Sequence, residues 1–122
     1  MSTLESLKKS FEFKYVFRNG RRYRAAHLGV YISNGKKSGV RVGLVVSKRV
    51  GNAVVRNKVK RRFREAMRNL AVLDGSGTPL DIVLLAGPDT PQAAYSEIYS
   101  ELRGVLEKHY AALRKYGSRD AP

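Results

Sequence analysis

The chain has 122 residues and a net charge of +14, from 24 lysines and arginines against 10 aspartates and glutamates. This length fits one domain with its own core, and the composition, 43% hydrophobic and 28% charged, is that of a globular protein. The absence of cysteine excludes a disulfide scaffold, a cysteine-ligated zinc site and a thiol nucleophile.

The basic charge is concentrated in one part of the chain. Residues 1–72 contain 19 basic and 3 acidic residues, whereas residues 73–122 contain 5 basic and 7 acidic residues. Such asymmetry points to a polyanionic partner, most often a nucleic acid. The apolar runs are far shorter than the roughly 18 residues that span a bilayer. Residues 1–9 lack the apolar core of a secretory signal, so we expect a cytoplasmic protein without a membrane partner.

The first elements predicted along the chain are a short helix and a strand. Residues 10–19 are predicted to be helical, because Phe13, Val16 and Phe17 fall on one face. Residues 21–34 are predicted to be a strand, with a kink near residues 25–26. One face of this strand carries Leu28, Val30 and Ile32, and the other carries Tyr23, His27 and Tyr31.

The rest of the chain predicts two buried strands and two long helices. Residues 41–47 and 80–86 are apolar runs of strand length, and the first of them is expected to be central in its sheet. Residues 53–72 form the clearest helix, and the last helix begins at Thr90 or nearer Tyr95 and runs to about residue 116. The apolar stripe of the first long helix consists of Val55, Val59, Phe63, Ala66, Met67 and Leu70.

This order of elements predicts an α+β fold. The order is α-β-β-α-β-α, and one of the β segments can consist of two strands. Such an order predicts a two-layer sandwich of helices packed on a small sheet. We expect a single RNA-binding domain over residues 1–122, with residues 1–7 and 117–122 flexible.

Catalytic groups are sparse in the sequence. A metal-dependent nuclease needs several carboxylates around its ions, and the basic half offers only Glu5, Glu12 and Glu65, far apart in the chain. His27 and His109 have no evident carboxylate or serine partner, and no phosphate-binding glycine loop or zinc-protease motif is present. We therefore predict no catalytic residue and no metal ligand in the protein itself.

Residues 48–64 form a dense basic segment, with eight lysines and arginines and no acidic residue. Gly51 permits a turn after the strand at 41–47, and Asn52 can cap the helix that follows. The start of a helix attracts anions, and Arg56 and Lys60, four residues apart, extend the positive strip along it. This arrangement is typical of a surface that binds RNA phosphates; a merely solvated helix face is the alternative.

Aromatic residues form a second candidate site. Phe13 and Phe17 share a helix face, and Tyr31 lies on the strand face opposite the apolar one. Aromatic side chains among basic residues bind single-stranded RNA by base stacking beside phosphate contacts, and core packing is the alternative. The flanking basic residues are Lys14, Arg18, Arg22 and Arg24.

The segment 41–61, RVGLVVSKRVGNAVVRNKVKR, resembles the signature of the bacterial ribonuclease P protein subunit. The Arg-Asn-Arg motif of that family corresponds here to Arg56-Asn57-Lys58, with lysine in the third place. Residues 13–20, FKYVFRNG, are similar to the family's N-terminal helix, and the resemblance extends over about residues 7–110.

The resemblance implies a fold and a function. The fold would be that of the second domain of ribosomal protein S5, with three helices and a mixed four-stranded sheet. The protein would be the accessory subunit, inactive alone, of a ribonucleoprotein that removes the 5′ leader from precursor tRNA. The RNA subunit would be the catalyst and would hold most of the Mg²⁺, and no obligate protein partner is implied.

The resemblance also implies two sets of contact residues. The RNA subunit would be contacted by Lys48, Asn52, Arg56, Asn57, Lys58, Lys60, Arg61 and Arg64. The single-stranded leader of precursor tRNA would be contacted by Phe13, Lys14, Phe17, Tyr31, Ser47 and Arg49.

Three other functions are compatible with a basic protein of this size. A structural RNA-binding protein of ribosomal or chaperone type is the main alternative. A helix-turn-helix DNA-binding protein fits less well, because the basic helix follows a buried strand rather than another helix. A membrane-surface protein fits least, because the apolar face of the basic helix is needed for the core.

Overall fold

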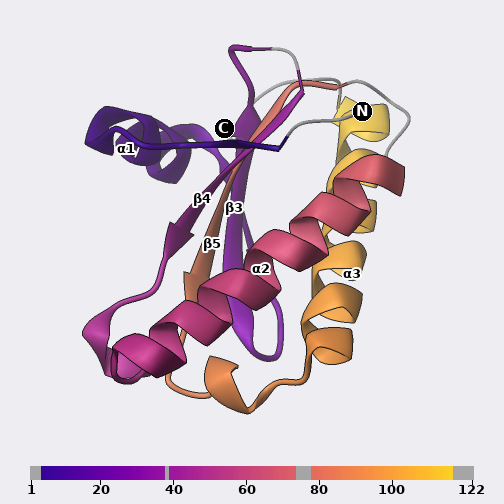
Figure 1. Ribbon diagram of the computed structural model, residues 1–122. Helices are drawn as coiled ribbons and strands as arrows, with labels where there is room; N and C mark the ends of the chain where they lie inside the picture. Colours follow the sequence, from indigo (N-terminus) through magenta and orange to yellow (C-terminus); the bar gives the residue numbers. More distant parts are fainter. Residues whose placement is uncertain (1–3, 38, 74–77, 117–122) are drawn as a thin grey trace.

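The computed structural model describes residues 4–37, 39–73 and 78–116, which form a mixed sheet with helices on both faces (Figure 1). The strands are β1 (Glu5–Ser6), β2 (Arg21–Arg24), β3 (Leu28–Asn34), β4 (Val40–Val45) and β5 (Leu80–Ala86). The helices are α1 (Ser10–Asn19), α2 (Ala53–Leu73) and α3 (Tyr95–Tyr116), with short 3₁₀ turns η1 (Lys48–Val50) and η2 (Thr90–Gln92). The predicted α+β class and its three helices are confirmed.

The sheet has five strands where four are predicted. Their order is β1-β4-β5-β3-β2, and β4 runs parallel to β5, to which α2 connects it. The middle strand is β5 rather than β4, and its residues 80–84 are buried. The additional strand is the two-residue β1, in which Glu5 pairs with Arg41 of β4.

Residues 5–7 pair with β4 at the edge of the sheet. Residues 1–7 are expected to be flexible, yet β1 pairs with β4 and the Leu7 side chain is only 5% exposed. The Leu7 N–H also donates to the carbonyl of Val42 at 3.0 Å. Residues 1–3 and 117–122 lie outside the described part of the chain.

The single strand predicted over residues 21–34 is instead a hairpin of β2 and β3. Tyr23 therefore pairs with Val30 in the antiparallel register and points to the same face as Val30. The prediction that Tyr23 and Tyr31 share a face is wrong, because the chain reverses completely at residues 25–27 where only a kink is predicted. Tyr23 packs at the edge of the core beside α3, where its Oη is hydrogen-bonded to Nδ1 of His109 at 2.8 Å.

The main core lies between the sheet and the helices α2 and α3, which cover the same face (Figure 1). The predicted stripe of α2 is confirmed: Phe63 is fully buried at its centre, and only Val55 is partly exposed. Helix α3 begins at Tyr95, the later of its two predicted starts, and Thr90–Gln92 is a separate 3₁₀ turn. Gly117, where this helix is predicted to end, lies outside the described residues.

Helix α1 covers part of the opposite face of the sheet. Val16 of α1 and Val83 of β5 are fully buried there, together with Leu7. The Phe13 ring lies so close to Gly43 that a Cβ at that position would be 2.5 Å from the ring. Because α1 has only ten residues, it leaves the rest of this face partly open.

Candidate nucleic-acid interface

The start of α2 has the geometry that the sequence predicts. Gly51 adopts a φ of 155°, which favours glycine, and the chain turns there from η1 into the helix. The Asn52 side-chain oxygen accepts a hydrogen bond from the Val55 N–H at 3.0 Å and so caps the helix. The start of α2 lies beyond the C-terminal end of β4, and residues 46–52 connect the two (Figure 1).

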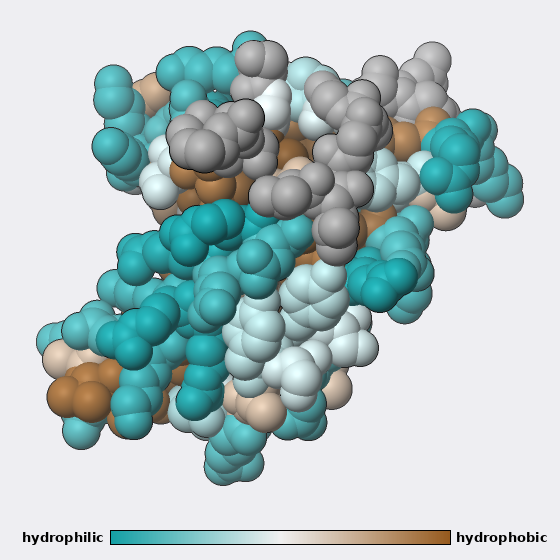
Figure 2. All heavy atoms as spheres, turned by 45° about the vertical axis from the view of Figure 1, so that its right-hand side comes forward, coloured by the Kyte–Doolittle hydropathy of each residue, from teal (hydrophilic) through white to brown (hydrophobic). Residues whose placement is uncertain are grey.

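The predicted RNA-subunit contacts form one surface on η1 and the outward side of α2, here called the basic helix surface. Hydrophilic side chains cover the outward side of α2 in Figure 2. Arg56 and Lys60 are half-buried at its margin, and the other predicted contacts are exposed. The exposed members are Lys48, Asn52, Asn57, Lys58, Arg61 and Arg64.

Arg68 extends this surface by a further helical turn. It lines a shallow groove of about 350 Å³ together with Asn57, Arg61, Arg64 and Glu65. The sequence analysis did not select Arg68, although it lies four residues after Arg64 on the same side of the helix. Among the described residues that line this groove, one is acidic, Glu65, and three are arginines, so the groove is predominantly cationic.

Arg62 has a different role from the basic residues on either side of it. Its Nη1 donates to the carbonyls of Pro91 at 3.2 Å and Ala93 at 3.0 Å, so it ties α2 to η2. The basic segment thus contains both RNA-contact candidates and a structural arginine. Arg62 lies on the side of α2 that packs against η2, whereas the contact candidates lie on its outward side.

The predicted aromatic residues meet on the partly open face of the sheet, and we call this region the aromatic cleft. The rings of Phe17 and Tyr31 pack edge to face, with centroids 5.0 Å apart and an angle of 86° between their planes. Phe17 is 38% exposed and Tyr31 is half-buried, so both rings present surface. Phe13 is more enclosed, because it packs on Gly43. Val45 and Leu85 form the rest of the apolar floor of the cleft.

Basic and polar side chains surround the aromatic cleft. Arg22 and Arg24 lie opposite Tyr31 and Gly29 in the hairpin register, and they line a groove of about 350 Å³ with Tyr31. Lys14 is exposed on α1, and Ser47 and Arg49 are exposed just beyond the end of β4. From the sequence, Arg22 and Arg24 are predicted only to flank the aromatic residues. Their position beside Tyr31 depends on the β2–β3 hairpin.

A buried ion-pair network holds α1 against the sheet. Arg41 is 7% exposed and donates to both oxygens of Asp81, at 2.9 and 2.7 Å, and to Glu12 of α1 at 2.7 Å. The N–H groups of Lys9 and Lys8 donate to Glu12, and these bonds, with Arg41, lower the pKa of its carboxyl. The three linked charges fix the position of α1 and so the opening of the cleft.

His27 has a carboxylate partner, contrary to the sequence analysis. Its Nδ1 donates to Glu101 of α3 at 2.6 Å, and its backbone N–H donates to the other oxygen of Glu101 at 2.7 Å. The hydrogen bond to Glu101 raises the pKa of the His27 imidazole. The pair joins the β2–β3 turn to α3, and the sequence shows no sign of it because the partners are 74 positions apart.

Three carboxylates, those of Glu12, Asp81 and Glu101, are held in ion pairs between elements of the fold. In residues 4–37, 39–73 and 78–116, no three histidine, cysteine, aspartate or glutamate side chains gather as they would around a metal ion. Over the same ranges no helix is long and apolar enough to cross a membrane.

Comparison with known proteins identifies the family. The family model described as ribonuclease P matches residues 1–110. The ribonuclease P protein component of Lachnoclostridium phytofermentans is 39% identical over 105 residues, which cover 86% of this chain and 89% of that protein. The structure of the Staphylococcus aureus RNase P protein matches with a TM-score of 0.75 at 30% identity, over 88% of this chain and 96% of that one. This chain therefore belongs to the ribonuclease P protein family, the accessory subunits of the endonuclease that matures the 5′ end of tRNA.

Proposed function

We propose that this protein binds the ribonuclease P RNA through the basic helix surface and the 5′ leader of precursor tRNA through the aromatic cleft. The observation that carries this proposal is the common location of the two surfaces. The N-terminus of α2 and the C-terminal ends of β4 and β5 lie at the same end of the molecule (Figure 1). A protein docked on the catalytic RNA by α2 therefore holds the cleft close to the same RNA.

Binding to the RNA subunit is proposed to be mainly electrostatic. Exposed cations on a rigid helix neutralise phosphates and release condensed counterions, which makes affinity depend steeply on salt. Asn52 and Asn57 are exposed among these cations and add neutral hydrogen-bonding groups.

Binding to the leader is proposed to combine stacking with phosphate contacts. Phe17 and Tyr31 present partly exposed rings on which unpaired bases can stack, and Phe13 supports them from the floor. The leader backbone would lie against the surrounding polar and basic side chains. Mature tRNA lacks the leader, so this cleft favours binding of the precursor over the product. The side chains in that role are Lys14, Arg22, Arg24, Ser47 and Arg49.

We propose that the RNA subunit supplies catalysis and holds the Mg²⁺. Glu12 and Asp81 are engaged with Arg41, and Glu101 is engaged with His27. These carboxylates do not fit a shared metal site in the protein. The proposal includes no membrane partner and no obligate protein partner, and it places the holoenzyme in the cytoplasm with its tRNA substrate.

The salt dependence of binding tests the basic helix surface. The triple variant Arg56→Ala, Lys60→Ala, Arg61→Ala should flatten the log–log salt slope for ribonuclease P RNA by roughly two to three units, at about 0.7–0.9 per lost phosphate contact. The matched control removes three exposed cations of α3, in Arg103→Ala, Lys108→Ala, Arg114→Ala, and should keep the slope. Equal slopes for the folded triple variant and the wild type would refute this assignment.

Cleavage at low Mg²⁺ tests the function as a whole. Added to a bacterial ribonuclease P RNA at a Mg²⁺ concentration that does not support cleavage by the RNA alone, the protein should restore removal of the leader. The protein without the RNA should cleave nothing. A protein that binds the RNA and leaves cleavage unchanged would indicate a purely structural RNA-binding protein instead.

A further inference from the structure

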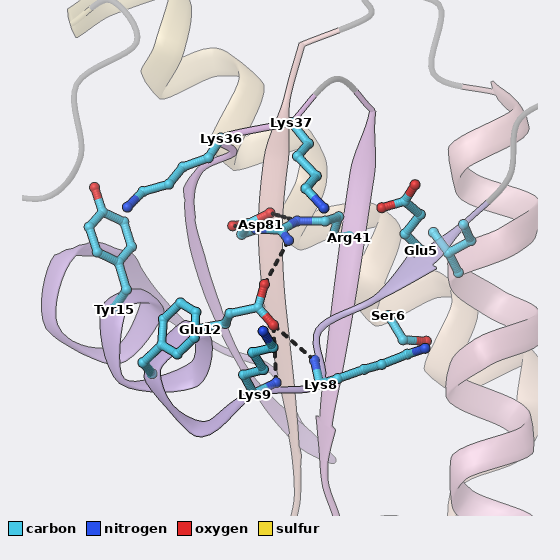
Figure 3. Close-up of a pocket in the computed structure, with 12 residues that line it drawn as sticks. Glu5, Ser6, Lys8, Lys9, Glu12, Tyr15, Lys36, Lys37, Arg41 and Asp81 are labelled. Carbon is cyan, nitrogen blue, oxygen red and sulfur yellow. Dashed lines mark hydrogen bonds and ion pairs between the residues drawn. The ribbon is translucent and has the colours of Figure 1, made fainter.

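The structure contains a second aromatic and basic hollow, whose lining includes none of the aromatic residues of the aromatic cleft (Figure 3). It lies between residues 4–9, α1 and the turn that joins β3 to β4, and we call it the N-terminal cavity. We propose that this cavity binds a segment of single-stranded RNA, with a base on Phe11 and phosphates on the surrounding lysines. This inference rests on the proposed function, because it takes RNA to be the ligand of the protein.

The cavity has the size of a ligand site. Its volume is about 720 Å³, within the range of about 300–1,000 Å³ that is usual for ligand pockets. The network of Arg41, Asp81 and Glu12 forms its floor, so its base is fixed by buried charges rather than by mobile side chains. The cavity is thus a built feature of the fold.

Phe11 is an aromatic side chain that the core does not use. It is 65% exposed on the first turn of α1, whereas Val16 of the same helix is fully buried. The Lys9 ammonium lies 5.8 Å from the centre of the Phe11 ring, which places a cation next to an open aromatic face. An exposed ring beside a lysine is the combination that binds a base and its phosphate.

The rim of the cavity is positively charged. Lys8 and Lys9 lie on one side of it, and Lys36 and Lys37 reach over it from the β3–β4 turn (Figure 3). Lys36 Nζ lies 4.3 Å from the centre of the Tyr15 ring, and this contact holds the ammonium at the edge of the cavity. Arg41 pairs Glu12 and Asp81 of the floor, and Glu5 is the remaining acidic residue of the lining, so the four lysines outnumber the acidic charge that faces the cavity.

Two RNAs of the holoenzyme offer a single-stranded segment with this chemistry. One is the distal part of the leader, beyond the nucleotides in the aromatic cleft, and the other is an unpaired strand of the RNA subunit. Both would place a base on Phe11 and phosphates on Lys36 and Lys37, so the experiment needs one binding measurement for each source.

The test uses two variants and a control with the same loss of charge as the second. Phe11→Ala removes the ring, and the double variant Lys36→Ala, Lys37→Ala removes two rim cations. The control, Lys108→Ala with Arg114→Ala, removes two exposed cations of α3. Affinity is measured for ribonuclease P RNA, and in the holoenzyme for precursor tRNAs with leaders of about 4 and about 16 nucleotides.

We expect Phe11→Ala to weaken binding of one of these RNAs by about 5- to 150-fold, and the lysine variant to flatten its salt slope by about one to two units. A loss restricted to the long leader identifies the leader as the ligand, and a loss for ribonuclease P RNA alone identifies the RNA subunit. The control should match the wild type, and the melting temperature of Phe11→Ala should be unchanged, because the ring is exposed.

The proposal is overturned if both variants bind ribonuclease P RNA and the two precursor tRNAs with the same affinity as the wild type. The triple variant of Arg56, Lys60 and Arg61, measured in parallel, separates this failure from failure of the proposed function. If only the triple variant loses affinity for ribonuclease P RNA, the cavity assignment alone is wrong. If the triple variant also binds like the wild type, the basic helix surface is wrong as well. If the Phe11→Ala variant does not fold, the affinities and salt slopes of the Lys36→Ala, Lys37→Ala variant still test the proposal.

Discussion

The two faces of the sheet are covered to different extents. The face under α2 and α3 is dry: Val30, Ile32 and Ile82 are each 1% exposed, and Leu84 is fully buried. On the face under α1, the buried cluster of the described residues is small and consists of Leu7, Val16 and Val83. Helices of 21 and 22 residues cover the first face, and a helix of ten residues covers the second.

This difference assigns stability mainly to one face of the sheet and ligand recognition to the other. Apolar area removed from water stabilises the fold in proportion to its extent, so the first face contributes most of the stability. On the second face the short helix leaves Phe17 and Tyr31 with exposed surface at one flank and Phe11 at the other. Hydrophobic and aromatic groups that the core does not need are therefore free to contact a ligand.

The largest effect is expected from truncating a phenylalanine on the covered face. Phe63 is fully buried against the sheet, so Phe63→Ala should lower the free energy of unfolding by about 3–5 kcal/mol. Denaturant unfolding followed by circular dichroism measures this change. A loss below about 1 kcal/mol would mean that this face is not the main source of stability.

A smaller stability effect is expected where α1 meets the sheet. In Gly43→Ala the new Cβ would lie 2.5 and 2.6 Å from Cε1 and Cζ of Phe13, so the ring must move. Overpacking of this kind costs about 1–3 kcal/mol and should also weaken leader binding. Gly104→Ala on α3 is the matched control, because its Cβ would meet nothing within 4 Å, and alanine there should stabilise the helix by roughly 0.5–1 kcal/mol.

Truncation on the open face should affect binding more than stability. Phe17→Ala removes a ring that is 38% exposed, so its stability loss should be well below that of Phe63→Ala. The holoenzyme should bind precursor tRNA more weakly by about 1–3 kcal/mol for the lost stack, and mature tRNA almost unchanged. Equal losses for both tRNAs, together with a large drop in melting temperature, would assign Phe17 to the core.

The smallest effect is expected for the His27–Glu101 pair, and it depends on pH. Glu101 raises the pKa of His27, with smaller contributions from Glu97 and Asp89. The charged pair therefore stabilises the fold fully below the unfolded-state pKa of about 6.5, and this contribution is lost as pH rises through the higher folded pKa. The stability difference between wild type and Glu101→Gln should be largest near pH 5–6 and shrink toward alkaline pH. In a His27→Asn background the Glu101→Gln change should show no such trend with pH.

The helical stripes and the basic helix surface were predictable because they depend on local spacing. A repeat of 3.6 residues places Val59, Phe63 and Met67 on one side of α2, and it places Asn57, Arg61 and Arg64 on another, whatever the rest of the chain does. The helix start needs only Gly51 and Asn52, which act on their immediate neighbours. The likeness of residues 41–61 to a known signature then supplied the family, which the comparisons confirm.

Only the tertiary structure decided the pairings between distant residues. The face of Tyr23 depends on a full chain reversal at residues 25–27, and β1 is a strand only because β4 lies beside it. The separation of Arg62 from the basic helix surface depends on carbonyls 29 and 31 residues away. The N-terminal cavity likewise brings together three separate segments of the chain. Period and spacing describe one segment at a time, whereas these features arise where segments far apart in the chain pack together.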